Sequence, residues 1–311
     1  MTKKILTLTL SAIALLSAYR AHAWGGVIAL GTESYLSFGI EGGPGGLLLN
    51  GTVSEPTRMG FTYGFNVGYT CYLNSNIGFN TGIHLSRMSS GFYESNIRSE
   101  GRGKLAIAGV TSGWTSAPFY LVTSRTDETY KTYFVEVPVM LAMQYRKWYW
   151  NLGLKVAVPF AMHVNYTYGE SELFVDKGAQ LGTGVVLDEP MYIGTYDGTS
   201  GTANIYDEQR HQLLMFYMLA SLEVGYNVAF YGGASSLSVG VYVDYSLNRA
   251  RLNNSGQTSM VELNSDEIKY NNSMQSGHIT SMECLKFGIC LHYNLGIGHG
   301  ARHSTRAMRF L

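Results

Sequence analysis

Near-strict alternation of apolar and polar side chains over two long stretches is the feature that most constrains how this chain folds. Residues 285–297 carry large apolar or aromatic side chains at every odd position and small or polar ones at the even positions, and residues 61–73 closely follow the same pattern. Because successive side chains of a strand point to opposite faces, each stretch has one apolar and one polar face. This pattern is typical of the wall of a membrane β-barrel, with lipid outside and a polar interior.

The composition agrees with a membrane protein that does not cross with helices. Charged residues make up 14% of the chain, against about 25% in ordinary soluble domains, and aromatic residues make up 13%. Beyond the first residues, no uninterrupted apolar run reaches the roughly 20 residues of a transmembrane helix. The net charge of zero removes the electrostatic basis for nucleic-acid binding.

The first 23 residues are organised like a secretory signal peptide. Lys3 and Lys4 form a basic segment, residues 5–18 are apolar, and Ala21-His22-Ala23 has the form of a cleavage site. We therefore expect residues 1–23 to be removed, a barrel domain over residues 24–298, and a short basic tail over residues 299–311. An uncleaved membrane anchor is the alternative, but its apolar core is short.

Eight alternating segments predict eight strands: residues 35–49, 59–73, 77–93, 129–145, 148–164, 212–230, 237–248 and 281–297. Tight turns follow the second, fourth and sixth segments, and long links follow the third, fifth and seventh. Outer-membrane barrels have an even number of antiparallel strands, short periplasmic turns and long extracellular loops. The prediction is an all-β, eight-stranded antiparallel transmembrane barrel in the outer membrane of a diderm bacterium. We expect a monomer surrounded by lipid, with residues 94–128 and 169–210 extending its hairpins beyond the membrane.

Aromatic residues collect near both ends of the predicted strands, as in the girdles at the two lipid interfaces of such barrels. The alternative is that these residues simply favour strands. Near the tight turns lie Tyr69, Tyr72, Trp148, Tyr149, Trp150, Tyr226, Tyr231 and Tyr293, and near the long loops lie Phe92, Tyr93, Tyr130, Tyr133, Tyr166, Tyr168 and Tyr245.

Ionisable residues on the inward faces predict a polar network in the lumen. An eight-stranded barrel is just wide enough for side chains to fill it, so we expect a satisfied polar core that plugs the barrel, with Glu136 and Lys155 paired across neighbouring strands. A narrow conduction path or a proton-linked site is the alternative. The predicted network consists of Glu41, His84, Glu136, Lys155, His163, Glu223, Asp244, Lys286 and His292.

The three cysteines are expected to be ordinary wall residues. Cys284 and Cys290 fall on the same face about 20 Å apart along one strand, too far for a disulfide, and Cys71 points to the opposite face. We expect no metal site, because no cluster of metal-binding residues has a suitable spacing in the sequence.

No catalytic residue or cofactor is predicted. His84, Ser86 and Glu136 provide a weak signal for a lipid-modifying enzyme, since a serine activated by histidine and an acid is a nucleophile, but polar residues are expected in a polar lumen. Acids of the predicted loops are candidates for weak calcium binding, although solvated charge is the simpler interpretation. These acids are Asp127, Glu128, Asp188, Glu189, Asp207 and Glu208.

Two neighbouring strands resemble the PorT-like outer-membrane β-barrel family of Bacteroidota-type bacteria. The first contains Phe-Val-Glu-Val-Pro-Val-Met-Leu at residues 134–141, and the second is the glycine-containing strand at residues 153–160. The resemblance implies an eight-stranded barrel. The founding member is linked to a secretion system for surface proteins, and most relatives have no assigned activity. The long loop at residues 169–210 departs from the smaller members. We therefore predict a structural or interaction protein, not an enzyme, whose loops meet an extracellular protein partner in secretion or envelope assembly. A small channel is the first alternative and a lipid-modifying enzyme the second.

Overall fold

The computed structural model describes residues 34–51, 57–73, 76–105, 115–179, 186–204, 216–229, 235–251, 261–264, 267–274 and 279–297. The predicted signal peptide and basic tail lie outside these residues. Among the described residues no helix is long and apolar enough to cross a membrane.

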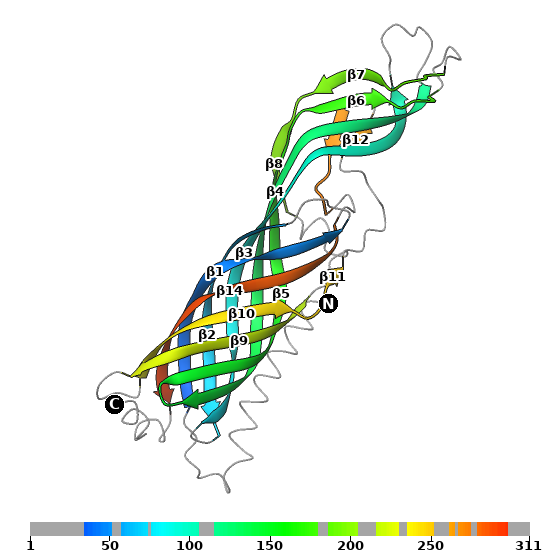
Figure 1. Ribbon diagram of the computed structural model, residues 1–311. Coiled ribbons are helices and arrows are strands. Elements are labelled where there is room, and N and C mark those ends of the chain that lie inside the picture. Colours follow the sequence, from blue (N-terminus) through cyan, green and yellow to red (C-terminus); the bar gives the residue numbers. More distant parts are fainter. Residues whose placement is uncertain are drawn as a thin grey trace.

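Eight antiparallel strands close a barrel (Figure 1). The ring runs β1-β2-β3-β4-β5-β9-β10-β14 and closes where β14 pairs with β1, from Ser34 opposite Ile297 to Gly51 opposite Ile279. This confirms the predicted fold and all eight strands. Their bounds are β1 (Ser34–Gly51), β2 (Arg58–Tyr72), β3 (Ile77–Leu105), β4 (Thr115–Tyr145), β5 (Trp148–Tyr168), β9 (Tyr217–Ala229), β10 (Ser235–Ser246) and β14 (Ile279–Ile297).

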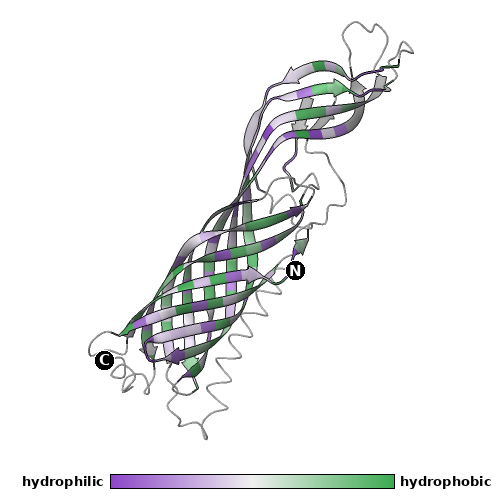
Figure 2. Cartoon of the chain, in the orientation of Figure 1, coloured by the Kyte–Doolittle hydropathy of each residue, from purple (hydrophilic) through white to green (hydrophobic). Residues whose placement is uncertain are grey.

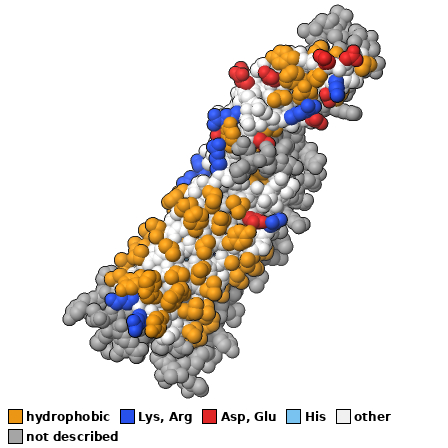
Figure 3. All heavy atoms as spheres, viewed as in Figure 1, with side chains coloured by type: hydrophobic (Ala, Val, Ile, Leu, Met, Phe, Trp, Pro, Cys, Tyr) orange, Lys and Arg blue, Asp and Glu red, His pale blue; other side chains and the backbone are white. Residues whose placement is uncertain are grey.

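The alternation read from the sequence separates the two faces of the barrel wall. On β14, Ile289 is 65% exposed on the outside while its neighbour Cys290 is 3% exposed on the inside. Figure 2 shows apolar and polar residues alternating along the barrel strands. Apolar side chains cover the visible face of the barrel in Figure 3, whereas charged side chains gather mainly on the part that projects from it. The apolar band has the character of a lipid-facing surface.

Two strands continue far beyond the barrel and form a projecting sheet, which we call the arm. β3 and β4 have 29 and 31 residues, whereas about 9 to 11 residues suffice to cross a membrane. β6 (Ser171–Val175) pairs with β4, and β7 (Met191–Tyr196) pairs with β6, so the arm sheet has the order β7-β6-β4-β3. Much of the predicted loops at residues 94–128 and 169–210 is therefore strand.

Four shorter strands lie at the end of the barrel that carries the arm or on the arm itself (Figure 1). β8 (Thr199–Asn204) pairs with β5, and β11 (Ala250–Arg251) pairs with β14. β12 (Val261–Asn264) and β13 (Glu267–Tyr270) form a separate hairpin that lies against β3. Opposite this end, tight connections join β2 to β3 and β4 to β5, as expected for the periplasmic side.

Irregular positions reverse the alternation in the upper part of the barrel. On β3 the buried residues change from even to odd positions around Asn96, which has a positive φ of 55°, although the pairing with β4 keeps its register there. A bulge lies on β5, where the pairing with β4 shifts at Tyr133/Phe134. Such bulges insert one unpaired residue and so exchange the inner and outer faces. Beyond the shift on β5, Met162 and Val164 point inward although the sequence pattern placed them outside.

The predicted aromatic girdles are only partly correct. Large aromatic side chains are exposed on the outer wall at Trp148, Tyr226, Tyr245 and Tyr293. Other members of the predicted girdles point into the interior, because they have the opposite strand parity or lie beyond a bulge: Tyr72, Phe92, Tyr130, Tyr149 and Tyr168. Tyr231 lies outside the described residues.

Candidate functional site in the barrel interior

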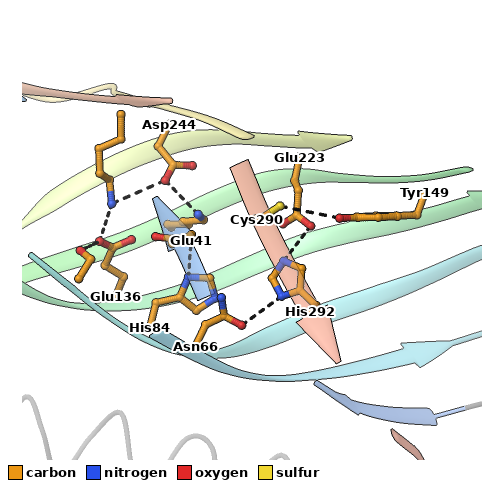
Figure 4. A network of polar contacts seen from close by, with 12 residues as sticks. Glu41, Asn66, His84, Glu136, Tyr149, Glu223, Asp244, Cys290 and His292 are labelled. Atoms are coloured by element: carbon orange, nitrogen blue, oxygen red, sulfur yellow. Dashed lines mark hydrogen bonds and ion pairs between the residues drawn. The ribbon is translucent and has the colours of Figure 1, made fainter. Parts of the chain in front are cut away.

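Two lysines and three acids form a buried charge cluster halfway along the lumen (Figure 4). Lys286 Nζ on β14 lies 2.5 Å from Glu136 Oε1 on β4 and 3.6 Å from Asp244 Oδ2 on β10. Lys155 on β5 reaches the same Asp244 oxygen at 2.9 Å. Buried charges are tolerated when they are paired and hydrogen-bonded, so these contacts are what allows the cluster to exist.

The third acid, Glu41, extends this cluster toward β3. Its Oε2 lies 3.8 Å from His84 Nδ1, and Ser86 donates a hydrogen bond to Glu136. The cluster therefore joins side chains from β1, β3, β4, β5, β10 and β14, and ties strands on opposite sides of the barrel together. An eight-stranded barrel is just wide enough for side chains such as these to occupy its interior.

The expected pair of Glu136 and Lys155 is not the one that forms. Each residue makes its ion pair elsewhere, Glu136 with Lys286 and Lys155 with Asp244. The register places Glu136 opposite Ala157 and Lys155 opposite Pro138, so the two are offset along the wall. Lysine side chains are long enough to reach acids on the opposite wall of a narrow lumen. The alternation pattern of two adjacent strands cannot predict such contacts across the lumen.

A second polar cluster lies closer to the short-turn end. His292 Nε2 on β14 is 3.2 Å from Glu223 Oε1 on β9, and His292 Nδ1 is 3.2 Å from Asn66 Oδ1 on β2. Cys290 Sγ lies 3.8 Å from the Tyr149 hydroxyl. Figure 4 shows these side chains converging from both sides of the lumen. The sequence pattern predicted that Glu223 and His292 point into the lumen. The alternation along β2 and β5 also places Asn66 and Tyr149 on the inward face.

The arm end of the lumen is closed by a third arrangement. Residues 271–274 are buried, and Glu128 on β4 holds them. The backbone N–H of Ser273 donates to Glu128 Oε1 at 2.9 Å, and the hydroxyls of Tyr130 and Tyr168 donate to the same carboxylate. We call this arrangement the Glu128 clasp. Apolar side chains surround it, including Met88, Phe92, Phe134, Met162, Val164, Leu219 and Met274.

The prediction that Glu128 is a solvated acid of a loop is wrong, because Glu128 is 0% exposed. It lies on β4 well beyond the residues needed to cross a membrane from the Tyr145 end. Burial raises the pKa of its carboxyl above the usual value, opposed by hydrogen bonds from Ser273, Tyr130 and Tyr168. Burial and the neighbouring Glu128 also raise the pKa of Tyr130 well above its ordinary value. Even-numbered residues of β4 such as Glu136 point inward. Continuing this alternation back along the strand to Glu128 would have predicted that Glu128 also points inward.

Eight of the nine predicted lumen residues do lie inside the barrel, and His163 does not. Its ring packs edge-on against Tyr133, 6.1 Å between centroids, on the outer side of the wall. The bulge at Tyr133/Phe134 is the reason, since it reverses the parity of β5 before His163 is reached.

The contacts of Ser86 do not fit the serine-nucleophile hypothesis. Ser86 donates its hydroxyl to Glu136, whereas a triad requires a hydrogen bond from serine to histidine. His84 and Ser86 are two positions apart on β3, about 7 Å along a strand. His84 instead faces Glu41.

Cys71, Cys284 and Cys290 are not joined to one another by a disulfide. Cys284 and Cys290 point into the barrel and Cys71 is partly exposed, which agrees with the predicted faces. Two groups of donor atoms lie within 4.8 Å of one another and have the residue types that bind metals: Glu41, His84 and Glu136, and Glu223, Cys290 and His292.

Comparison with known proteins agrees with this architecture. Residues 22–188, more than half of the 311-residue chain, match the model of a family described as outer membrane protein beta-barrel domain. The chain belongs to this outer-membrane β-barrel family. A member of this family resides in the outer membrane, as the sequence predicted.

The chain is also similar to several solved structures. One is Ail, the attachment invasion locus protein of Yersinia pestis, solved with the heparin analogue sucrose octasulfate; identity is 9%, TM-score 0.32, and coverage 85% of this chain and 99% of Ail. Another is a FadL homologue of Pseudomonas aeruginosa, with 8% identity, a TM-score of 0.19, and coverage of 84% and 89%. At these TM-scores neither structure informs the function. Comparison with curated proteins gives no match.

Proposed function

We propose that this barrel anchors an interaction protein in the outer membrane, and that the arm is the part that binds an extracellular protein partner. The observation that carries the proposal is the continuous sheet of the arm. β3 and β4 leave the barrel without a break and are joined by β6 and β7. A hydrogen-bonded sheet costs less conformational entropy on binding than a flexible loop, so it suits recognition.

The arm carries a cross-strand row of aromatic side chains on its exposed face. Tyr120 and Phe174 stack with their centroids 5.1 Å apart, and Phe174 contacts Tyr192 at 5.6 Å. The Arg98 guanidinium lies 3.9 Å from the centre of the Tyr120 ring, and Tyr192 is 53% exposed. Tyrosine and arginine are enriched in the energetically dominant parts of protein interfaces. We call these four residues the aromatic row.

The filled lumen supports interaction rather than transport as the main role. Charge pairs occupy its middle and the Glu128 clasp its arm end. The resemblance to PorT-like proteins supports a partner that belongs to protein secretion or envelope assembly. In this proposal the barrel acts as a monomer, without cofactor or catalytic activity.

Site-specific photocrosslinking in cells that produce the chain tests the proposal. A crosslinking residue in place of Tyr192 should capture one defined envelope protein, and Phe174→Ala with Arg98→Ala should reduce that capture at least tenfold. The same probe in place of Ile289, in the apolar band, is the matched control and should not capture this protein. Equal capture at both positions, or none at Tyr192, would refute the proposal.

Planar bilayers distinguish this role from that of a channel. The full chain should give no reproducible single-channel steps, because charged and apolar side chains fill the lumen. Regular steps that change size in Glu136→Gln or Lys155→Met would favour the channel instead.

A further inference from the structure

We propose that Glu223, Cys290 and His292 form a binding site for Zn²⁺ in the lumen, a role independent of the arm. A carboxylate, a thiolate and an imidazole are the three ligand types that zinc takes from proteins. Their donor atoms lie within 4.8 Å of one another. Zinc bonds of about 2.0 to 2.3 Å in tetrahedral geometry place donors roughly 3.5 Å apart, so only small side-chain movements are needed. No metal site was predicted because Glu223 lies far from Cys290 and His292 in the sequence.

The hydrogen bond of His292 prepares its other ring nitrogen for a cation. Asn66 Oδ1 is an acceptor, so His292 Nδ1, 3.2 Å away, is the donor. His292 Nε2 then faces Glu223 Oε1 at 3.2 Å, but the two atoms are not aligned as a hydrogen bond. A proton on Nε2 points toward the carboxylate, and a cation that replaces this proton between the two atoms would bind both. Metal-bound histidines regularly donate their second N–H to an oxygen in this way.

Glycines leave room for the cluster. Gly240 on β10 lies between β9 and β14, and a Cβ there would be 3.2 Å from Cys290 Sγ and 2.5 Å from the Tyr149 hydroxyl. A Cβ at Gly39 would collide with His292 Nδ1 and the Asn66 side chain. Any larger residue at these two positions would displace the proposed ligands or the residue that orients them.

Local charge distinguishes this site from the other candidate group. Glu136 already has Lys286 at 2.5 Å, so a dication among Glu41, His84 and Glu136 would meet lysine charge. Glu223 has no lysine or arginine within 4.0 Å among the described residues. When Zn²⁺ binds, the Cys290 thiol and the Nε2–H of His292 release their protons to water, and Zn–S and Zn–N bonds form. The carboxylate and thiolate then balance the charge of the ion.

The proposed ligands are less completely buried than the central charge cluster. The side chains of His292 and Glu223 are 12% and 10% exposed, whereas Lys286 and Glu136 are fully buried. Polar side chains line the next layer toward the short-turn end, where Asn294 donates to Ser238 at 2.6 Å and Ser238 bonds to Asn227. Tyr149 lies beside Cys290, so its hydroxyl or a water is available as the fourth ligand.

The test uses the full chain folded in detergent micelles, with Co²⁺ as a spectroscopic probe and Zn²⁺ as competitor. We expect one Co²⁺ per chain, a thiolate-to-cobalt absorption band, and displacement by Zn²⁺. Cys290→Ser should abolish the band and weaken Zn²⁺ affinity at least 100-fold. Asn66→Ala, which removes only the orienting hydrogen bond, should weaken affinity about 10- to 100-fold.

A matched control separates Cys290 from the other thiols. The double variant Cys71→Ser with Cys284→Ser keeps Cys290 as its only cysteine and should bind as the parent chain does. Zn²⁺ should raise the thermal unfolding midpoint of the parent and of this double variant, but not of Cys290→Ser. An unchanged band in Cys290→Ser, or a folded parent chain that binds no Co²⁺, would overturn the proposal and leave a histidine–glutamate ion pair.

Discussion

The two halves of the lumen are both closed, but by different chemistry. From the middle of the lumen to the short turns, charged and polar side chains from the wall strands pair with one another, as Lys286 does with Glu136 and His292 with Glu223. In the half near the arm, apolar side chains pack around Glu128, which binds residues 271–274. The first half is filled by the barrel wall itself, and the second by a segment that returns from outside it.

This difference shows that the side chains inside a barrel can be polar in one part of the lumen and apolar in another. Period-two alternation specifies only which residues face inward, and an inward residue can be part of a polar network or of an apolar core. The half that depends on buried ion pairs should respond strongly to loss of one charge. The half closed by the Glu128 clasp should respond locally.

Loss of the central lysine should produce the largest effect. Lys286→Met leaves Glu136 and Asp244 with less compensation in a buried site, which should lower the free energy of unfolding by about 3 to 5 kcal/mol. Urea unfolding in micelles, followed by tryptophan fluorescence, measures this. Adding Glu136→Gln should recover part of the loss by removing one uncompensated charge. A change in the free energy of unfolding below about 1 kcal/mol for Lys286→Met would mean that these ion pairs do not stabilise the barrel.

Loss of the Glu128 clasp should have a smaller and more local effect. Glu128→Ala takes the carboxylate from the Ser273 N–H, at a cost of about 1 to 3 kcal/mol, while the hydroxyls of Tyr130 and Tyr168 keep Ser273 Oγ and Asn271 O as partners. Hydrogen exchange of residues 271–274 should accelerate while that of β9 and β10 stays unchanged. Equal acceleration along the whole barrel would show that the two halves do not open separately.

The Glu128 clasp should also weaken as the pH rises. Burial raises the pKa of Glu128, so the folded chain holds this proton more tightly than the unfolded chain does. Its contribution is complete below the unfolded pKa of about 4.3 and is lost as the pH rises through the higher folded pKa. After correction for intrinsic exchange rates, residues 271–274 should lose protection from acidic to neutral pH. Glu128→Gln removes this titration and should remove that dependence; if protection instead grew with pH, the assigned direction would be wrong.

His163 should give the smallest effect of this series. Because its ring lies outside the wall against Tyr133, His163→Ala should change the free energy of unfolding by no more than about 0.5 kcal/mol. His84→Ala, on an inward position of β3 beside Glu41, is the matched comparison and should cost more. Similar losses for the two variants would contradict the reversal of parity on β5.

Most of the barrel could be predicted because its signal is local. The wall strands alternate in the sequence as they do in the structure, and eight of the nine lumen residues follow from parity alone. His163 could not be assigned because a bulge adds one residue to the count without an evident sequence mark. Glu128 was assigned to a loop because the apolar alternation fades where the strands leave the membrane, although they continue into the arm.

The sequence by itself determined the strands, their inner and outer faces, and the membrane setting, since lipid outside and a polar lumen inside impose period two on each strand separately. Tertiary structure alone decided the partners within the lumen. Lys286 meets Glu136 across the barrel, Glu223 meets Cys290 and His292 across β10, and Ser273 meets Glu128 after a return from a distant part of the chain. These contacts depend on closure of the ring and on the reach of side chains across it, and neither is encoded in the spacing of neighbouring residues.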